Sequence, residues 1–469
     1  MARHQATAAL ALVALLASCT TVGPDYQAPV AGEMASPAWN EPAPLGEVDL
    51  VWWRQFGDPL LTQLVEQTIA DSPDVRIAEA RLAEARANRD AIAGRQLPNV
   101  TTSGRASENV LSENGTLPVG SLPGLSREYS LFDLGFDASW EIDLWGRNRR
   151  SLEGANARAD AALEAKRDVQ LMLAGEIARA YFDLREAQAR VQVARQQLAS
   201  NQALARLTHL RFTAGEANRI EAQRADVASS NSAGALQQAE AHASSFAYQI
   251  ASLMGVAPES IVPELRVLRA IPASPDTILV GIRTDLLQRR PDIRRAERNM
   301  AAASADIGVA TADLFPRFSL FGSLGQQARS VGDLASPNST RLAIGPSFSW
   351  PIFSGGQTRA QIAASDARYD AAVGAYEKAV NTSLSDSESA INRFARAREA
   401  ANEARAALNS EQASFRLVQR RVSAGEDDHL ALERARLSLC LASTAYDAAS
   451  ANEGRAAAAL YKSLGGGWQ

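Results

Sequence analysis

The sequence has few cysteines and histidines, residues that often serve in catalysis and metal binding. Among its 469 residues are two cysteines and four histidines. Two cysteines are too few for a disulfide framework, and no histidine has a second histidine at the helical H-x-x-x-H spacing of a zinc site. Walker loops, nucleophile elbows and HExxH patterns are missing, so we expect no enzyme, metal or cofactor. The net charge is -5 without a long basic block, which gives no indication of nucleic-acid binding.

Long apolar runs are also missing. No run approaches the ~20 residues that a membrane-spanning helix needs. The longest run near the N-terminus extends from Ala8 to Ala17 after a short basic start, as in an export signal. Residues 16–19 resemble a bacterial lipobox, so we expect a signal peptide at 1–18 and lipidation of Cys19; an ordinary signal peptide is the alternative. Cys440 lies in a helical stretch and is interpreted as a packed apolar residue.

The chain contains two tandem copies of one unit. Residues 72–76 are echoed at 290–294, and residues 211–216 are echoed at 421–426. A proline-rich segment separates the copies. The expected organisation is a signal peptide (1–18), an N-terminal lipidated segment (19–70), repeat 1 (71–256), a linker (257–288), repeat 2 (289–464) and a flexible tail (465–469).

Each copy contains a helix followed by two segments with strand periodicity. The clearest has seven apolar residues at a spacing of two from Phe132 to Leu144, with polar residues between them. One apolar and one polar face suit a membrane strand between lipid and a wet lumen, although a soluble half-buried sheet is the alternative. The expected strands lie at about 98–106, 131–144, 315–325 and 342–353. Four strands cannot close a barrel, since the smallest have about eight, so several chains must share one.

Each copy then continues as a helical hairpin, expected at 147–254 and 356–464. The first helix is free of proline over more than sixty residues, about 100 Å at 1.5 Å per residue. Large apolar residues recur every seven positions from Ile177, with alanine at the companion position. Gly215 and Gly425 end the long helices as hairpin tips. A coiled-coil scaffold lipoprotein would explain these helices but not the amphipathic strands.

Several motifs resemble one protein family. They are Cys19 followed by Val22-Gly23-Pro24-Asp25-Tyr26, Trp52-Trp53 with Phe56, Asp58-Pro59-Leu60, and Arg289-Arg290-Pro291-Asp292-Ile293-Arg294. In combination they are similar to the TolC-like outer-membrane factors, the lipoprotein channels of tripartite efflux pumps. The resemblance covers nearly the whole chain after Cys19.

The resemblance implies a fold, a location and partners. Three chains would close a 12-stranded membrane β-barrel, continued into the periplasm by a long α-helical barrel. The N-terminal segment, linker and C-terminus would form a belt around it. The homotrimer would be a passive exit duct in the outer membrane, held by its barrel and a lipid anchor at Cys19. A periplasmic adaptor would dock on the hairpin tips and an inner-membrane pump would supply small molecules.

The tips are the expected gate. Glu426, Asp427 and Asp428 follow Gly425, and threefold repetition would make a carboxylate ring that filters cations. Acidic residues that cap a helix are the structural alternative. Leu430 lies where the family places an apolar constriction, Arg434 replaces an acid that the family commonly carries, and Glu221 stands where an Asp is common. We hypothesise that Arg434 pairs with a neighbouring tip carboxylate in the closed state.

Overall fold

The computed structural model describes residues 21–30, 36, 38–113 and 126–468. The expected signal peptide and the lipidation site Cys19 lie outside the described residues. The chain divides into two compact units. We call Met1–Ala28, Ala83–Ala161 and Ala296–Tyr376 the sheet unit, and Pro29–Leu82, Ala162–Arg295 and Glu377–Gln469 the helical unit.

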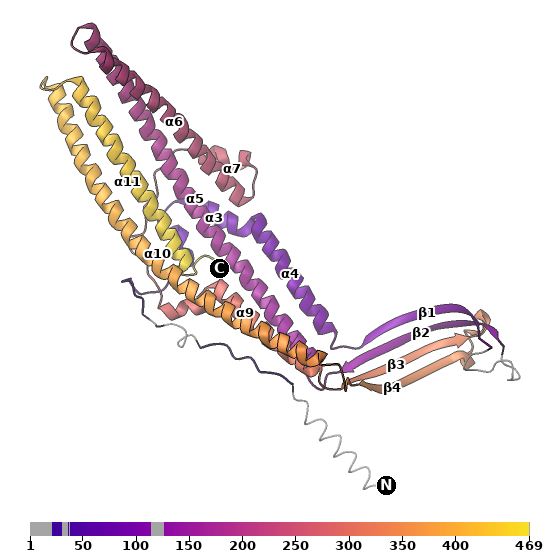
Figure 1. The fold of residues 1–469 in the computed structure, drawn as a ribbon. Helices are drawn as coiled ribbons and strands as arrows, with labels where there is room; N and C mark the ends of the chain where they lie inside the picture. Colours follow the sequence, from indigo (N-terminus) through magenta and orange to yellow (C-terminus); the bar gives the residue numbers. More distant parts are fainter. Residues whose placement is uncertain (1–20, 31–35, 37, 114–125, 469) are drawn as a thin grey trace. The chain divides into compact units, whose positions relative to one another are not determined.

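The sheet unit contains four antiparallel strands that lie side by side in chain order (Figure 1). They are β1 (Asn99–Val110), β2 (Glu128–Ile142), β3 (Arg317–Ala328) and β4 (Thr340–Ser349). The prediction of four strands in two pairs is therefore confirmed. Residues 350–353, which we expected in the last strand, lie beyond its end. Pro351 has no amide hydrogen to continue the ladder, so alternation alone was a poor guide there.

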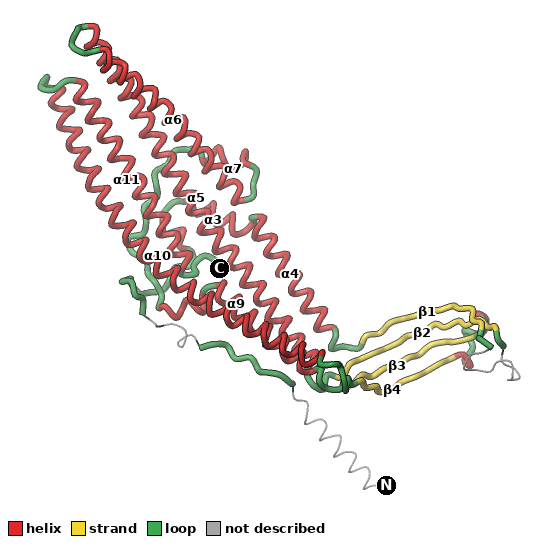
Figure 2. Tube along the Cα trace, viewed as in Figure 1, coloured by secondary structure: helices red, strands yellow, loops and turns green. Residues whose placement is uncertain are grey.

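The other elements are helical (Figure 2). The long hairpins pair α5 (Arg147–Thr213) with α6 (Arg219–Met254) and α10 (Gln357–Ser423) with α11 (His429–Ser463). The helices before the strand pairs are α4 (Pro73–Gly94) and α9 (Pro291–Ala312). The short helices are η1 (Trp52–Phe56), α3 (Pro59–Asp71), α7 (Pro258–Leu265), η2 (Arg283–Asp285), α8 (Leu286–Arg289), η3 (Val331–Asp333) and η4 (Pro337–Ser339). Within the described ranges, every helix is too short or too polar to cross a membrane.

The seven-residue repeat of the long helices forms a packed seam. On α5 the seam positions Ile177, Leu184 and Val191 are buried, and so are the alanines that follow each of them by three residues. On α10, Phe394 and Ala401 are buried. Small alanine side chains allow neighbouring helices to approach closely, and Val191 and Ala194 of α5 pack in one apolar cluster with Ala239 of α6.

Trp52 and the C-terminal glycines pack together in the core of the helical unit. Trp52 is fully buried, stacks on Tyr461 with ring centroids 5.4 Å apart, and donates from Nε1 to the Gly466 carbonyl oxygen at 3.1 Å. A Cβ on Gly466 would lie 3.0 Å from the Asp49 carbonyl oxygen. Our expectation of a flexible tail at 465–469 is thus corrected for its described residues, because these glycines permit close packing.

The Arg-Arg-Pro-Asp-Ile-Arg motif holds the same region together. Arg290 donates from Nη1 to the Ser463 carbonyl oxygen at 3.0 Å, at the end of α11. Arg294 pairs with the buried Glu164 of α5, with 2.8 Å between Nη2 and Oε1. The motif therefore ties the start of α9 to both long hairpins within the helical unit.

One tightly packed glycine provides a test of this core. A Cβ on Gly454 of α11 would overlap the Phe182 ring of α5. We expect Gly454→Val to lower stability by about 1–3 kcal/mol, the usual cost of overpacking. The measurement is the melting temperature of the purified protein in detergent.

Gly234 of α6 is the matched control. A Cβ there meets nothing within 4 Å. Since alanine is preferred over glycine inside helices by about 1 kcal/mol, Gly234→Ala should melt at the wild-type temperature or above. Equal melting temperatures for Gly454→Val and wild type would contradict the packing described above.

Candidate functional site: an amphipathic sheet and two helical tips

The strand register separates apolar and polar side chains onto opposite faces. Along the ladders Phe136 pairs with Leu324 and Leu324 with Leu342, whereas Asp133 pairs with Arg105 and Gln327. Successive side chains alternate between faces, so one face is mainly apolar and the other mainly polar across the four strands, although Phe321 of β3 lies on the polar face. The apolar face carries Val100, Phe132, Leu134, Phe136, Trp140, Ile142, Phe318, Leu320, Leu324, Leu342, Ile344 and Phe348. The polar face carries Ser103, Arg105, Asp133, Asp137, Glu141, Ser319, Ser323, Gln327, Arg341 and Ser347.

The apolar face is uncovered within one chain. Leu342 and Ile344 are each 73% exposed, and Phe348 is 71% exposed. A contiguous apolar surface of this kind marks an interaction with lipid or another protein. In the described residues, moreover, β1 pairs only with β2 and β4 only with β3, which leaves one edge of each without a strand partner.

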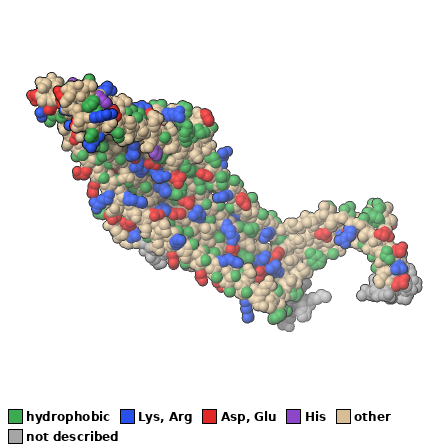
Figure 3. All heavy atoms as spheres, turned by 45° about the horizontal axis from the view of Figure 1, so that its top comes forward, with side chains coloured by type: hydrophobic (Ala, Val, Ile, Leu, Met, Phe, Trp, Pro, Cys, Tyr) green, Lys and Arg blue, Asp and Glu red, His purple; other side chains and the backbone are tan. Residues whose placement is uncertain are grey.

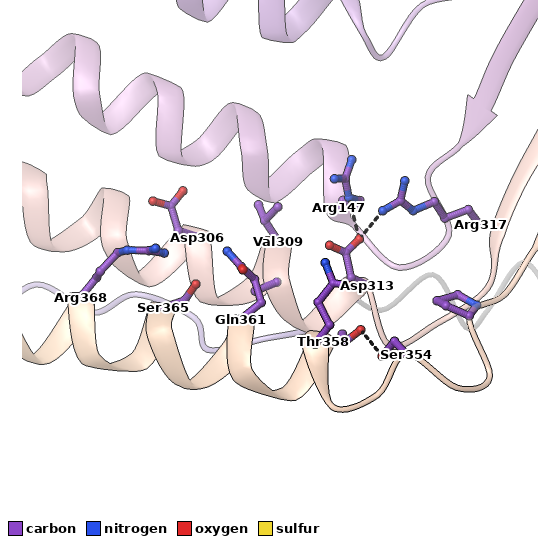
Figure 4. Close-up of a pocket in the computed structure, with 13 residues that line it drawn as sticks. Arg147, Asp306, Val309, Asp313, Arg317, Ser354, Thr358, Gln361, Ser365 and Arg368 are labelled. Atoms are coloured by element: carbon purple, nitrogen blue, oxygen red, sulfur yellow. Dashed lines mark hydrogen bonds and ion pairs between the residues drawn. The ribbon is translucent and has the colours of Figure 1, made fainter.

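An ion-pair cluster lies where the strands of the sheet unit meet its helices (Figure 4). Asp313, just after α9, accepts from Arg147 Nε at 3.0 Å and from Arg317 Nη2 at 2.6 Å. The three residues line a pocket of about 530 Å³ between α9 and α10. Sequence reasoning missed this cluster, because each member is an ordinary charged residue at the boundary of an element.

The N-terminal segment is bound to the sheet unit. The Val22 amide donates to the Trp145 carbonyl oxygen at 3.1 Å, and Arg150 pairs with Asp25 at 2.6 Å. Tyr26 donates to Glu297 of α9, and burial together with that carboxylate raises the pKa of Tyr26 above its usual range. The segment that follows Cys19 is therefore held at the start of α5.

The first helical tip joins α5 to α6. The Glu216 amide donates to the Arg211 carbonyl oxygen at 2.8 Å, and Gly215 has a φ of 78°. This is a Schellman end, for which glycine supplies the left-handed conformation. Asn218 then caps α6, accepting from the Glu221 amide at 2.9 Å and donating to the Glu221 side chain at 2.9 Å. Both the backbone amide and the side chain of the candidate gate residue Glu221 are thus bonded to the side chain of the cap residue.

The second tip repeats this geometry with different charges. The Glu426 amide donates to the Arg421 carbonyl oxygen at 2.9 Å, and Gly425 has a φ of 76°. Asp428 caps α11 by accepting from the Ala431 amide at 2.8 Å. Asp427 pairs with Arg421, with 3.1 Å between Oδ2 and Nε. Asp428 therefore caps a helix, as in the structural alternative, whereas Asp427 has an ion-pair partner in its own chain.

The other two candidate gate residues differ in exposure. Leu430 is only 8% exposed within its own chain, which does not favour an apolar constriction built from its side chain. Arg434 is exposed, and among the described residues it forms no ion pair, whereas Arg436 pairs with Glu433 at 2.8 Å. The guanidinium of Arg434 is thus open to a partner from another chain.

Two carboxyl groups on α11 are affected by burial. Desolvation raises the pKa of Asp447 and the pKa of Glu453 above their usual values. Because the folded chain holds these protons more tightly than an unfolded chain, their contribution to stability is present at low pH and is lost as the pH rises through the raised values. Within the described ranges no cluster of His, Cys, Asp and Glu could hold a metal ion.

The capping geometry gives a prediction for the second tip. Asp428→Ala removes the acceptor for the Ala431 amide and should cost about 0.5–2 kcal/mol of local stability. Hydrogen exchange should accelerate in the first turn of α11. Asp427→Ala leaves that cap in place and should not accelerate it. Equal exchange in the two variants would contradict the assignment of Asp428 as the cap.

Amphipathic strands and long helical hairpins in two copies define a channel subunit, and comparisons with known proteins agree. The profile of the outer membrane efflux protein family matches residues 64–256 and 282–466. The solved structure of the outer-membrane channel OprN is 35% identical with a TM-score of 0.84, covering 96% of this chain and 100% of that chain. Nodulation protein T of Rhizobium leguminosarum bv. trifolii is 33% identical over 74% of this chain and 73% of its own. The pyoverdine export outer membrane protein OpmQ of Pseudomonas aeruginosa is 28% identical over 97% of each chain.

The chain belongs to the outer membrane efflux protein family. It is an outer-membrane efflux channel component of a tripartite pump, and the family transports without catalysing a reaction. The predictions of family, fold class and function are thereby confirmed. The solved structure of OprN is that of an outer-membrane channel, and the CmeC channel of Campylobacter jejuni, 20% identical with a TM-score of 0.86, shares the fold.

Proposed function

We propose that three copies of this chain close their sheets into one 12-stranded membrane barrel and form a passive exit duct for small molecules. The observation that carries the proposal is the pair of sheet edges, on β1 and β4, that have no strand partner among the described residues, in a sheet with one mainly apolar and one mainly polar face. In lipid every backbone polar group needs a partner within the protein. An even number of antiparallel strands allows β4 of one copy to pair antiparallel with β1 of the next, so identical chains continue the pattern.

The two faces of the sheet then have distinct surroundings. The apolar face meets lipid, and the polar face lines a water-filled lumen. The helical hairpins of three copies extend the duct into the periplasm as an α-helical barrel. On the face drawn in the space-filling view, acidic and basic side chains are interspersed over the helices without a large patch of one sign (Figure 3), which suits a wall that touches both water and neighbouring helices.

The lipid anchor is Cys19 in this proposal. Its support is the lipobox-like sequence and the binding of the next described residues to the sheet unit. The pair between Arg150 and Asp25 and the Val22–Trp145 hydrogen bond hold that segment beside the ends of the strands. An acyl chain on Cys19 would therefore reach the inner leaflet of the outer membrane at the base of the barrel.

The helical tips serve as the periplasmic end of the duct. A periplasmic adaptor docks there, and an inner-membrane pump delivers the cargo. We infer that the gate closes through charged groups between chains, with Arg434 meeting a tip carboxylate such as Glu221 or Asp427 of a neighbouring copy. The exposed, unpaired guanidinium of Arg434 and the burial of Leu430 support this choice over an apolar ring.

The membrane face of the sheet is tested by neighbouring substitutions on β4. Ile344 lies on the apolar face and Ala343 on the polar face. An arginine on the lipid face at the midplane costs about 2–4 kcal/mol. We expect Ile344→Arg to reduce the amount of heat-modifiable trimer in the outer membrane, and Ala343→Arg to leave it near the wild-type amount. Equal losses in the two variants would contradict the assignment of faces.

The gate is tested by recordings from single channels in planar bilayers. Arg434→Ala should raise the conductance or the open time, because it removes the cation that pairs between chains. Arg436→Ala is the control, since its partner Glu433 lies in the same chain. An unchanged conductance for Arg434→Ala refutes the charge gate but leaves the duct itself intact.

A further inference from the structure

A long arginine side chain crosses the polar face of the sheet. Arg341 lies at the start of β4, yet its guanidinium reaches Asp133 on β2, with β3 between them. Arg341 Nη2 lies 2.7 Å from Asp133 Oδ1, and Arg341 Nε lies 3.1 Å from Asp133 Oδ2. Arg341 also donates to Ser323 of β3, and Gln327 donates to Asp133 Oδ2 at 2.7 Å. The guanidinium of Arg341 and the carboxylate of Asp133 thus each have more than one hydrogen-bond partner.

Two paired glycines make room for this crossing. Gly135 of β2 and Gly325 of β3 are directly opposite each other in the register. A Cβ on Gly135 would lie 3.1 Å from Arg341 Nη2, and a Cβ on Gly325 would lie 3.3 Å from Arg341 Cζ. Without side chains at these positions, the guanidinium lies flat against the backbone of the sheet. We call Arg341, Asp133 and this glycine pair the clasp.

The clasp has further charged residues beside it. Asp133 neutralises Arg341, whereas Arg105, the register partner of Asp133 on β1, forms no ion pair among the described residues. Further along the same face of β2 lie the carboxylates of Asp137 and Glu141. The register places Arg341 level with Gly135, midway between Asp133 and Asp137 on this face of β2, so the two arginines and the two carboxylates nearest the clasp balance in charge.

We propose that the clasp sets both the width and the charge of the duct at this level. The inference rests on the proposed closure of the sheet around a lumen. Arg341 is the pore-lining residue that determines selectivity, and Asp133 is a positioning residue that keeps the arginine flat against the wall. If Asp133 loses its charge, three released arginines extend toward the axis, where they narrow the passage and attract anions.

The experiment compares two losses of charge on the same face of the same strand. Asp133→Asn releases Arg341, whereas Asp137→Asn removes an equal charge and leaves the clasp intact. Full-length trimers are recorded in planar bilayers under a KCl gradient. Both variants should shift the reversal potential toward anion preference, but only Asp133→Asn should show a loss of single-channel conductance. Adding Arg341→Gln to Asp133→Asn should restore the conductance of the wild type.

The outcomes separate the clasp from the duct. Wild-type protein that assembles but does not conduct refutes the proposed function. Wild-type protein that conducts, with equal conductance for Asp133→Asn and Asp137→Asn, refutes the clasp alone. If Asp133→Asn yields no trimer, the single variant Arg341→Gln is recorded instead. The clasp then predicts the conductance of the wild type with a shift toward cation preference, and a conductance below that of the wild type overturns the proposal.

Discussion

Backbone hydrogen bonding is the constraint on which the rest of this structure depends. A sheet of four strands leaves one unpaired ladder of amides and carbonyls on β1 and another on β4. In water these edges would be solvated, but in hydrocarbon each unpaired group costs several kcal/mol. In the proposed assembly, the edge strands of neighbouring copies supply these missing partners. The helical part of the chain is duplicated together with the sheet, with one hairpin for each strand pair.

The helices meet a different demand. Helices that form the wall of a duct must pack closely. Alanines at the seam of α5 and the contact of Gly454 with Phe182 allow α5 and α11 to approach each other. The wall must also face water, so the charged residues pair locally, as Arg455 does with Asp183 and Glu186 at 2.8 Å. The side chains of these pairs are only 17–23% exposed. Their role is to let charged surfaces pack beside one another without leaving buried charges unpaired.

Periodicity made much of this fold predictable from sequence. The spacing of two between Phe132 and Ile142 and the spacing of seven from Ile177 report directly which side of an element is buried. The flexible tail was mispredicted because three consecutive glycines are equally compatible with freedom and with close packing, and only the position of Trp52 decides between them. The ion pair of Arg341 with Asp133 could not be predicted, since it depends on strand register between residues 208 positions apart in the sequence. The pair of Asp313 with Arg147 joins the ends of two helices 166 positions apart, and no sequence pattern connects them.

The packing of Trp52 against Tyr461 and Gly466 has a consequence for the order of assembly. The hydrogen bond from Trp52 joins residues 414 positions apart, so the core of the helical unit lacks its last pieces until the end of the chain has been made and exported. A nascent chain of this kind cannot close this core early. Apolar side chains such as Trp52 therefore stay exposed to solvent until residues near Gly466 are present, which makes the incomplete chain prone to aggregation.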